Sequence, residues 1–493
     1  MEKFKVLFVF PNTYLNIGIP QGIAILSACL KEAGFETDLF DYTFVKTEEI
    51  ERSEERQNFL PTEYTLYDLV KDDPVVNLDE MFRNKIKDFK PDLIAVSVMS
   101  STYDDGVKLL CNNRDSVNCP VVFGGVHATL DPKDTLNNDI VNYAIVGEGD
   151  EAIVDLANCL SRKTDPSNLD NLAYKDNDGN VVVNKLRSFV DLNTLPCPDW
   201  SIFDKRHFFR PFMGKIYTGS FYTMSRGCPY ACNYCVNSTL KVIQKECGRY
   251  FRLQSAKKTI SDLKQLKEKY GVNWIKFADD SIMSMSIEYL KELRDGLKEL
   301  DIMFGCSVRP ETTTDEKVSI LKDMGCVAMS VGIESGNEEL RKVQLGRRMS
   351  NEQIINAIKI MNDYDIRVST FNMVGLPGEK RENVFETIEL NRKLKVSSCN
   401  CYIVYPYPGT PIAIKYQTAY RNDNGEFIPV EEASTFRLSE MNPDEVEGLQ
   451  KTFNLYLHLP KELWPVIELA EKDDADAGVI LNSLNELTDK YYL

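Results

Sequence analysis

Three closely spaced cysteines are the residues of this chain with the clearest chemical potential. Cys228, Cys232 and Cys235 stand in the segment SRGCPYACNYCVNS, with three residues in the first gap and two in the second. Three thiolates on one short loop can ligate three corners of a 4Fe-4S cluster, which leaves the fourth iron without a protein ligand. An iron with an open coordination position can bind a small molecule and act on it.

A structural zinc site is the competing interpretation. Cys247 lies twelve residues after Cys235, so four cysteines are at hand for tetrahedral zinc. Zinc knuckles usually pair their ligands as C-x-x-C, whereas the first gap here holds three residues. The thirteen cysteines, an odd number spread over the chain, do not indicate a disulfide framework. The spacing therefore favours an iron–sulfur cluster.

Length and charge limit the kind of protein. The 493 residues suffice for two large domains with full cores. No stretch has the length of a membrane span or of a signal peptide, so we expect a cytoplasmic protein without a membrane span. The net charge is −17, and the chain from Thr410 onward has sixteen acidic and seven basic residues. This balance repels phosphate backbones, so nucleic acid is not an expected partner.

Residues 1–165 alternate predicted strands and helices. The order predicts an α/β domain with a doubly wound, five-stranded parallel sheet, which binds ligands at the carboxyl ends of its strands. Apolar runs predict the strands, and helical periodicity predicts the helices. The strands are expected at 5–11, 37–42, 92–100, 120–129 and 143–149, and the helices at 19–34, 78–89, 104–114 and 150–162.

The rest of the chain divides into three predicted parts. Residues 166–210 form a hairpin over 171–184, turned at Asp178–Gly179, and a linker. Residues 211–410 form a partial parallel barrel of six βα units, with reactive residues at the carboxyl ends of the strands. Residues 411–493 are mostly helical, around 442–459 and 460–490, and we expect a small core packed on the barrel rather than a substrate lid. The barrel strands are expected at 216–227, 274–280, 303–310, 327–335, 367–378 and 399–409.

Polar residues and glycines follow successive strands of the predicted barrel. Together with the cysteine loop, this series resembles the radical S-adenosylmethionine (radical SAM) family. The resemblance implies a 4Fe-4S cluster on the three cysteines and S-adenosylmethionine (SAM) at its open iron. Carboxylates would accept hydrogen bonds from the amine or ribose of SAM, Arg309 or Arg348 would clamp its carboxylate, and Tyr234 would pack on the adenine or the cluster. The expected SAM-binding residues are Tyr234, Asp279, Asp280, Arg309, Glu334, Ser335, Gly336, Arg348 and Gly375.

The first domain resembles a cobalamin-binding domain. Glycines suit this role because a bare backbone lets the corrin tail lie close. The cobalt-ligating D-x-H-x-x-G loop of such domains is missing, since the loop after the first strand is PNTYLNIG. We therefore expect cobalamin without a histidine on cobalt, or a domain that keeps the fold and binds nothing. His127 is interpreted as positioning a loop or contacting the tail, with cobalt ligation as the less favoured alternative. The expected contacts are Ser97, Ser101, Gly124, Gly125, His127, Gly147, Glu148 and Gly149.

The joint resemblance implies a cobalamin-dependent radical SAM enzyme. We expect it to methylate an unactivated carbon or phosphorus of a small-molecule, lipid or natural-product substrate. An electron donor such as a flavodoxin or ferredoxin would reduce the cluster. Two alternatives stay open: a radical SAM cyclase, coupling or rearrangement enzyme without methyl transfer, and a cobalamin- or zinc-binding sensor with no turnover.

Overall fold

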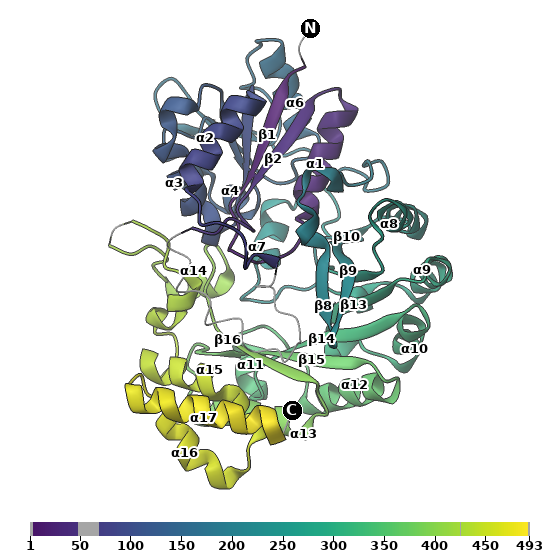
Figure 1. Cartoon of the computed structure of the whole chain (residues 1–493), viewed down its shortest axis with the longest axis vertical. Coiled ribbons are helices and arrows are strands. Elements are labelled where there is room, and N and C mark those ends of the chain that lie inside the picture. The colour runs from purple at the N-terminus through teal and green to yellow at the C-terminus, as the bar shows by residue number, and fades with distance from the viewer. Residues whose placement is uncertain (1–2, 48–68, 424, 492–493) are drawn as a thin grey trace. The chain divides into compact units, whose positions relative to one another are not determined.

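The computed structural model describes residues 3–47, 69–423 and 425–491, which fall into two compact units (Figure 1). The first unit comprises Met1–Arg226 and Thr239–Trp274. The second comprises Gly227–Ser238, which holds the cysteine loop, and Ile275–Leu493. The four-part division drawn from the sequence stays a prediction.

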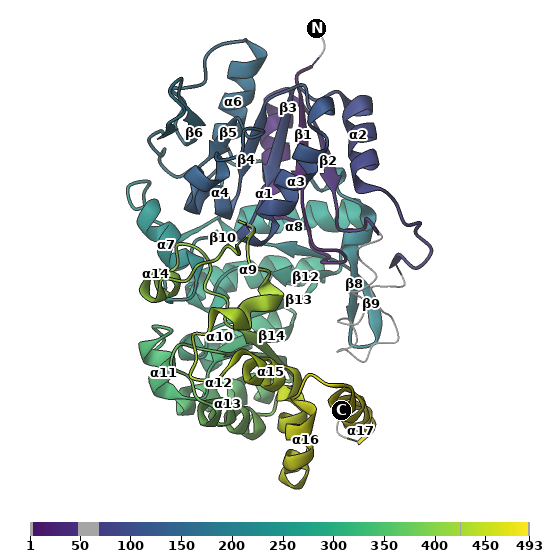
Figure 2. The same ribbon diagram turned by 90° about the vertical axis from the view of Figure 1, so that its left-hand side faces the viewer.

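A doubly wound sheet dominates the first unit, as predicted. Its strand order is β2-β1-β3-β4-β5-β6-β7, and β1 to β5 pair in parallel. Helices α1 and α6 lie on one face and α2 and α3 on the other (Figures 1 and 2). The elements are β1 (Lys5–Phe10), α1 (Gln21–Glu32), β2 (Glu36–Asp41), α2 (Leu78–Phe89), β3 (Leu93–Ser97), α3 (Tyr103–Asn112), β4 (Val121–Gly124), α4 (Val126–Leu130), α5 (Pro132–Thr135), β5 (Tyr143–Ile145) and α6 (Ala152–Ser161).

Two details of this sheet differ from the prediction. The strand expected over 120–129 ends at Gly124, because Gly125 has a φ of 99° and its backbone lies against that of Val98. His127 is therefore helical. The predicted hairpin forms, with β6 (Leu172–Lys175) and β7 (Val181–Val183), but it joins the sheet by antiparallel pairing with β5. The sheet thus has seven strands rather than five.

The first barrel strand is shorter than expected. The predicted strand over 216–227 is β9 (Lys215–Tyr222) followed by the short β10 (Ser225–Arg226). β9 pairs antiparallel with β8 (Phe209–Phe212), and its Thr218 carbonyl accepts the N–H of Asn273 at 2.9 Å, just before β12. The remaining elements here are α7 (Val236–Ile243), β11 (Arg252–Leu253) and α8 (Ala256–Tyr270).

The second unit carries the strands that position the candidate site. Its strand order is β16-β15-β14-β13-β12, with β13 to β16 parallel. Helices α9, α10, α12 and α13 follow one another along one face of these strands (Figure 1). The elements are β12 (Trp274–Phe277), α9 (Ile287–Leu300), β13 (Met303–Val308), α10 (Asp315–Asp323), β14 (Cys326–Glu334), α11 (Glu338–Val343), α12 (Asn351–Asp363), β15 (Arg367–Val374), α13 (Arg381–Lys393), β16 (Ser398–Ile403) and α14 (Pro411–Tyr416).

The two faces of these strands have different environments. In β15 the residues Val368, Thr370, Asn372 and Val374 are buried, whereas the alternate residues are half-buried. The period of two places successive side chains on opposite faces. Thr370 donates to Asn391 of α13 at 2.8 Å, so the buried face is the one that the helices cover. The opposite face is left accessible in part.

The C-terminal region is helical and packs on the sheet, as expected. Helix α15 (Pro443–His458) packs with Phe453 and Leu449 against Cys399 and Cys401 of β16. The helix expected over 460–490 is divided into α16 (Trp464–Ala470) and α17 (Ala475–Tyr491). The second helix starts anew because the Asp474 carboxylate accepts the N–H of Ala477 at 2.8 Å. No helix in the described part of the chain is long and apolar enough to cross a membrane.

A buried carboxyl holds the turn after β15. Glu379 is fully buried, and its Oε2 accepts the N–H groups of Gly375 at 2.7 Å and Leu376 at 3.1 Å. Gly375 has a φ of 82°, which favours glycine. Burial raises the pKa of Glu379 to about 8, against the lowering effect of the two N–H groups.

This raised pKa predicts pH-dependent stability. The pKa of Glu379 in the folded state lies above that of a free glutamate. Its protonated carboxyl therefore contributes to the free energy of unfolding at low pH, and this contribution is lost as pH rises toward about 8. One titrating group changes the free energy of unfolding by at most about 1.4 kcal/mol per pH unit. The midpoint of thermal unfolding of Glu379→Gln, measured between about pH 5 and pH 9, should therefore increase relative to that of the wild type as pH rises. Glu382→Gln changes an exposed position on α13, so its midpoint should follow the same pH dependence as that of the wild type. Parallel curves for Glu379→Gln would contradict the assignment.

Candidate functional site

The cysteine loop buries two of its three thiols. Cys228 and Cys232 are buried, and Cys235 is half-buried. The N–H of Cys235 donates to the carbonyl of Cys232 at 3.2 Å, and the Cys228 thiol lies within electrostatic range of both others. Burial raises the pKa of Cys228 to about 11 and raises the pKa of Cys235 as well. The thiolates therefore need positive charge beside them.

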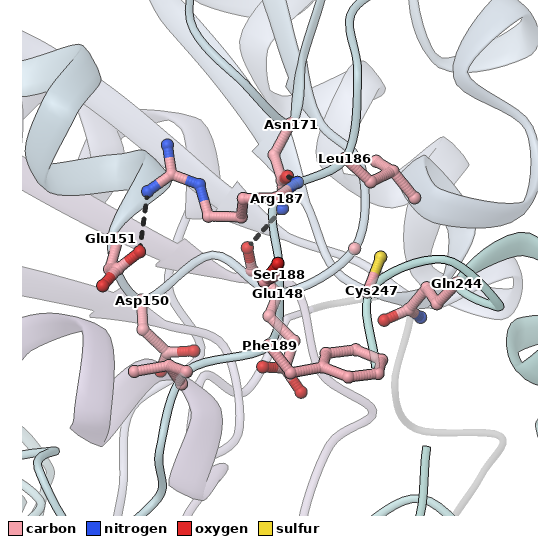
Figure 3. A pocket seen from close by; sticks show the side chains of 12 residues that line it. Glu148, Asp150, Glu151, Asn171, Leu186, Arg187, Ser188, Phe189, Gln244 and Cys247 are labelled. Atoms are coloured by element: carbon pink, nitrogen blue, oxygen red, sulfur yellow. Dashed lines mark hydrogen bonds and ion pairs between the residues drawn. The ribbon is translucent and has the colours of Figure 1, made fainter. Parts of the chain in front are cut away.

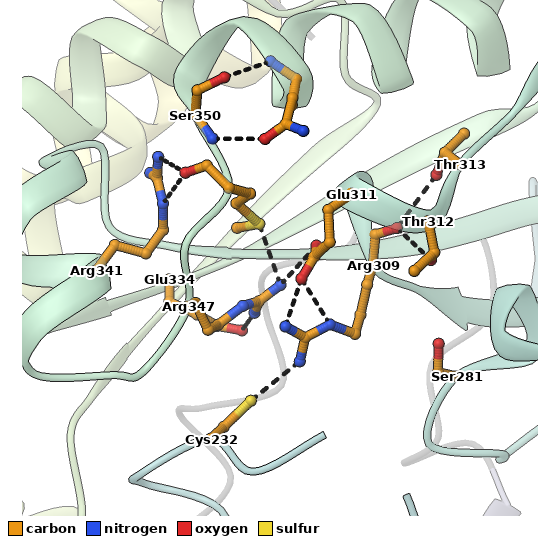
Figure 4. Close-up of polar contacts among 12 residues, drawn as sticks. Cys232, Ser281, Arg309, Glu311, Thr312, Thr313, Glu334, Arg341, Arg347 and Ser350 are labelled. Carbon is orange, nitrogen blue, oxygen red and sulfur yellow. Dashed lines mark hydrogen bonds and ion pairs between the residues drawn. The ribbon is translucent and has the colours of Figure 1, made fainter. Parts of the chain in front are cut away.

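Arg309 supplies a cation to the loop. It follows β13, and its Nη1 donates to Sγ of Cys232 at 3.0 Å (Figure 4). The guanidinium carbon lies 3.9 Å from the centre of the Tyr230 ring, and Nε donates to Oε1 of Glu311 at 2.9 Å. A guanidinium on the sulfur stabilises its anionic form, which is the form that ligates iron. Arg309 therefore acts on the cysteines directly.

Asn233 ties the same loop to the segment after α11. Its backbone N–H donates to the carbonyl of Leu345 at 3.0 Å, and its side-chain amide donates to the carbonyl of Gln344, also at 3.0 Å. Gly346 follows with a φ of 69°, and a Cβ there would lie 3.3 Å from Oδ1 of Asn233. The loop and the residue after Gly346 are thus fixed together. That residue is Arg347.

Arg347 and Glu334 form a buried ion pair at the end of β14. Nη1 of Arg347 lies 2.6 Å from Oε1 of Glu334, which also accepts the hydroxyl of Tyr234 at 3.0 Å. The Arg347 side chain is only 2% exposed. Burial alone would lower the pKa of Arg347, but Tyr234, Glu334 and Glu311 raise it above its ordinary value. Glu334 has a φ of 69°, a strained conformation that is typical of functional sites.

A second buried arginine holds the segment that carries Arg347. Arg341 is fully buried and donates through Nη2 to the carbonyl of Met349 at 2.8 Å and to Oδ1 of Asn351 at 2.9 Å. Its Nη1 donates to the carbonyl of Ser335. These bonds close the chain between β14 and α12 into a rigid loop. Arg341 therefore positions Arg347.

Two atoms of this network have unused hydrogen-bonding capacity. Nε of Arg347 and Oε2 of Glu311 are buried, and neither has a hydrogen-bond partner among the described residues. Oε2 of Glu311 lies 3.8 Å from Nη2 of Arg347. A buried donor and a buried acceptor that both lack a hydrogen bond fit a ligand with a carboxylate and an amine group, because unmet buried polar atoms are costly.

The remaining expected SAM contacts lie in different environments. Asp279 is buried, and Asp280 is exposed and accepts from Nδ2 of Asn237 at 3.1 Å. Ser335 is buried, and its hydroxyl accepts the N–H of Asn337 at 3.2 Å, whereas the N–H of Gly336 donates to Oγ1 of Thr387 on α13 at 2.7 Å.

Arg347 is the residue that the sequence interpretation missed. Arg348 is exposed, whereas Arg347 joins Tyr234 and Glu334. The segment LGRRMS offers two adjacent arginines, and spacing alone does not choose between them. Glu311 and Asn233 were missed as well: Glu311 comes directly after the strand expected over 303–310, and Asn233 lies between two cysteines of the loop.

A single-ion site is not found around the cysteines. Across residues 3–47, 69–423 and 425–491, no group of three or more His, Cys, Asp or Glu side chains is arranged to hold a metal ion. In a cubane each cysteine ligates a different iron, so its ligands need not converge on one point. Cys247 belongs to the first unit and lines a small pocket with Gly147, Glu148 and Gln244 (Figure 3).

The carboxyl ends of β3 and β4 are open at the positions expected for cobalamin. Ser101 is exposed, Ser97 is half-buried, and a Cβ on Gly124 would meet no atom within 4 Å. His127 is buried instead. Its Nδ1 lies 3.2 Å from Oγ of Ser100, its Nε2 lies 3.2 Å from Oδ2 of Asp134, and its ring packs on Tyr103.

The end of β5 is occupied by ion pairs. Glu148 pairs with Arg252 and lies 3.2 Å from Arg226, and Asp150 holds Arg226 through two bonds of 2.6 and 2.8 Å. The Glu148 carbonyl accepts Nδ2 of Asn171 at 2.9 Å (Figure 3). Gly147 has a φ of 87°, and a Cβ on Gly149 would touch Leu26 at 3.4 Å. The Glu148 carboxylate thus orders this loop through arginine.

Two family models match the chain. The radical SAM superfamily model matches residues 222–390, and the B12 binding domain model matches residues 64–157. The chain therefore carries a radical SAM domain and a B12-binding domain. The first match covers the cysteine loop and the network around Arg347, and the second covers the open ends of β3 and β4.

Relatives and solved structures agree with this family. The uncharacterized methyltransferase PH0819 of Pyrococcus horikoshii is 26% identical over 83% of this chain and 82% of its own length. The cytidylyl-2-hydroxyethylphosphonate methyltransferase of Streptomyces wedmorensis is 21% identical over 83% of this chain and 80% of its own length. The structure of the radical SAM methyltransferase TsrM from Kitasatospora setae, with cobalamin and a 4Fe-4S cluster bound, aligns with a TM-score of 0.67 and 15% identity over 99% of this chain and 100% of TsrM. The expected fold is thereby confirmed.

The adjacent arginines provide a matched test of the network. Arg347→Met leaves the Glu334 carboxylate buried without its cation, which typically costs about 3–5 kcal/mol. Arg348→Met changes an exposed side chain, with an expected effect within about 0.5 kcal/mol. Hydrogen exchange of the β14 and β15 amides should therefore lose protection in Arg347→Met only. Equal protection in both variants would contradict the buried pair.

Proposed function

We propose that this protein is a cobalamin-dependent radical SAM enzyme that methylates an unactivated carbon or phosphorus of a small-molecule, lipid or natural-product substrate. The observation that carries the proposal is the buried network that joins the cysteine loop to the ends of β13 and β14 through Arg309 and Arg347. The two family domains and the methyltransferase relatives support the same conclusion. When bound, the cofactors supply reductive cleavage of SAM and a transferable methyl group.

The cysteine loop would hold the cluster. Cys228, Cys232 and Cys235 are its ligands, and Arg309 lowers the free energy of the thiolate at Cys232 by donating to its sulfur. Burial of Cys228 and Cys232 keeps water from the sulfurs, which tunes the potential of such clusters. The loop stays in place because Asn233 binds the backbone of Gln344 and Leu345.

The Arg347 network would hold the amino-acid end of SAM. Nε of Arg347 donates to the carboxylate, and Oε2 of Glu311 accepts from the amine. Asp279 and Asp280 follow β12 and accept from the amine or the ribose, and Tyr234 packs on the adenine or the cluster. Arg348, being exposed, has no part in this assignment.

The first unit would hold cobalamin at the open ends of β3 and β4. Ser97, Ser101 and Gly124 present small side chains or bare backbone there, Gly125 lies against the backbone of Val98, and the Gly147–Gly149 loop follows β5. His127 orders this edge through Ser100 and Asp134, so cobalt is bound without it. An electron donor such as a flavodoxin or ferredoxin is needed to reduce the cluster. A cytoplasmic location stays a prediction.

Metal content tests the cluster. Anaerobically prepared protein should carry about four irons and four sulfides per chain. Cys232→Ser should remove most of this iron, because it deletes the ligand that Arg309 contacts. Cys247→Ser, in the first unit, should retain it. Stoichiometric zinc with no iron after reconstitution would contradict the proposal and favour a sensor without turnover.

By-products test methyl transfer. Methylation by this route uses two molecules of SAM, one leaving S-adenosylhomocysteine and one leaving 5′-deoxyadenosine. With its substrate, the protein should form both in near-equal amounts, together with a product heavier by one methylene. Cys228→Ala should abolish 5′-deoxyadenosine. Formation of 5′-deoxyadenosine without any S-adenosylhomocysteine would point to a cyclase, coupling or rearrangement enzyme instead.

A further inference from the structure

A row of four serines crosses the face of the second unit's sheet that the helices leave uncovered. In the strand register Ser307 of β13 lies beside Ser330 of β14, Ser330 beside Ser369 of β15, and Ser369 beside Ser398 of β16. All four are half-buried, and the hydroxyls of Ser369 and Ser398 lie 2.7 Å apart. Side chains this small leave room above the sheet. The row offers hydroxyl donors and acceptors to a ligand lying across the strands.

Lys276 of β12 extends onto this row. Its Nζ donates to Oγ of Ser330 at 3.0 Å, and no carboxylate lies within ion-pair distance of it among the described residues. Burial lowers the pKa of Lys276, against a raising effect of the Cys306 and Cys326 thiols and with no contribution from a carboxylate. An ammonium has three N–H donors, and Ser330 takes one of them. A half-buried cation without a counter-charge is costly unless a ligand supplies the charge.

The charge of this face differs from that of the whole chain. In a protein of net charge −17, the strands β12 to β16 contain one acidic residue, Glu334, and that residue is paired with Arg347. Arg367 lies two residues before Ser369 on the same face of β15 and forms no side-chain ion pair with another described residue. The face therefore has two uncompensated cations and a row of hydroxyls. Its complement is an oxyanion.

We propose that the substrate is an acidic small molecule whose carboxylate or phosphate group binds Lys276 and the serine row Ser307–Ser330–Ser369–Ser398. The inference rests on the proposed function, because it treats this face as the substrate site of the same enzyme. The oxyanion takes the two free N–H donors of Lys276 and the hydroxyls beside it. The rest of the substrate then extends along the strands toward their carboxyl ends, where Glu334 and Arg347 lie.

Competitive amine labelling tests the site without turnover. The full-length holoprotein is acetylated in inorganic phosphate, in acetate or in chloride at equal ionic strength, and each lysine is followed by peptide mass spectrometry. Phosphate or acetate at ten times its dissociation constant should slow labelling of Lys276 roughly tenfold by mass action. Exposed Lys342 of α11 should label alike in all three salts. Protection by phosphate alone assigns a phosphoryl substrate, and protection by acetate assigns a carboxylate. Equal labelling of Lys276 in all three salts overturns the proposal.

Two variants establish that the anion binds at Lys276. Phosphate or acetate should raise the thermal midpoint of the wild type and of Lys276→Arg, and should leave that of Lys276→Met unchanged. A midpoint that rises equally in Lys276→Met places the anion elsewhere and overturns the proposal; if this variant does not fold, the labelling result decides alone. The outcome is separate from that of the proposed function. Loss of iron with Lys276 still protected would refute only the enzyme assignment, and an intact cluster with Lys276 unprotected would refute only the anion site.

Discussion

The buried ion pair between Arg347 and Glu334 is the interaction on which the candidate site depends. A guanidinium this deeply buried is stable only beside negative charge, and Glu334 provides it at 2.6 Å. The pair in turn fixes the backbone around it. Glu334 takes a left-handed conformation, and Gly332 must lack a side chain, because a Cβ there would lie 3.0 Å from Nη1 of Arg347 and would collide with the Glu334 carboxylate. Local strain at the strand end is thus maintained by a charge interaction.

From this pair, charges alternate toward the cysteines. Glu334 faces Arg347, Arg347 faces Glu311, Glu311 faces Arg309, and Arg309 donates to Cys232 (Figure 4). Each charge is compensated by its neighbours, so the chain of contacts can be buried. The unused Nε of Arg347 and Oε2 of Glu311 are the exceptions. Polar atoms left unmet in this way reduce stability, and a ligand that satisfies them recovers the loss. The same network thereby orders the loop, and its two unmet atoms support the proposal that it binds an amino-acid group.

Much of the fold could be predicted because apolar periodicity is a local signal. The strands at 303–310 and 367–378 differ from β13 and β15 only at their ends. The predicted bounds are wrong where a non-local contact or a helix cap determines where an element begins or ends. Gly125 ends β4 because it lies against Val98, and Asp474 starts a new helix.

The candidate site was predictable only in part. The sequence alone indicates three of its residues. Cys232 belongs to the cysteine motif, and Arg309 and Glu334 stand at the ends of predicted strands. The choice of Arg347 over Arg348 depends on which side chain the turn at Gly346 directs inward. Lys276 stands in a correctly predicted strand, but its significance depends on Ser330, which lies 54 positions away. No local pattern shows that a lysine lacks a counter-charge.

We propose that the Arg347 network holds the amino-acid group of SAM at the open iron of the cluster. Electron–nuclear double resonance on the reduced protein can detect this group, with SAM isotopically labelled at its amine nitrogen and carboxylate oxygens. Both labels should show hyperfine coupling to the cluster in the wild type and in Arg348→Met. A protein that carries the cluster and binds SAM, yet shows no coupling to either label, would contradict it.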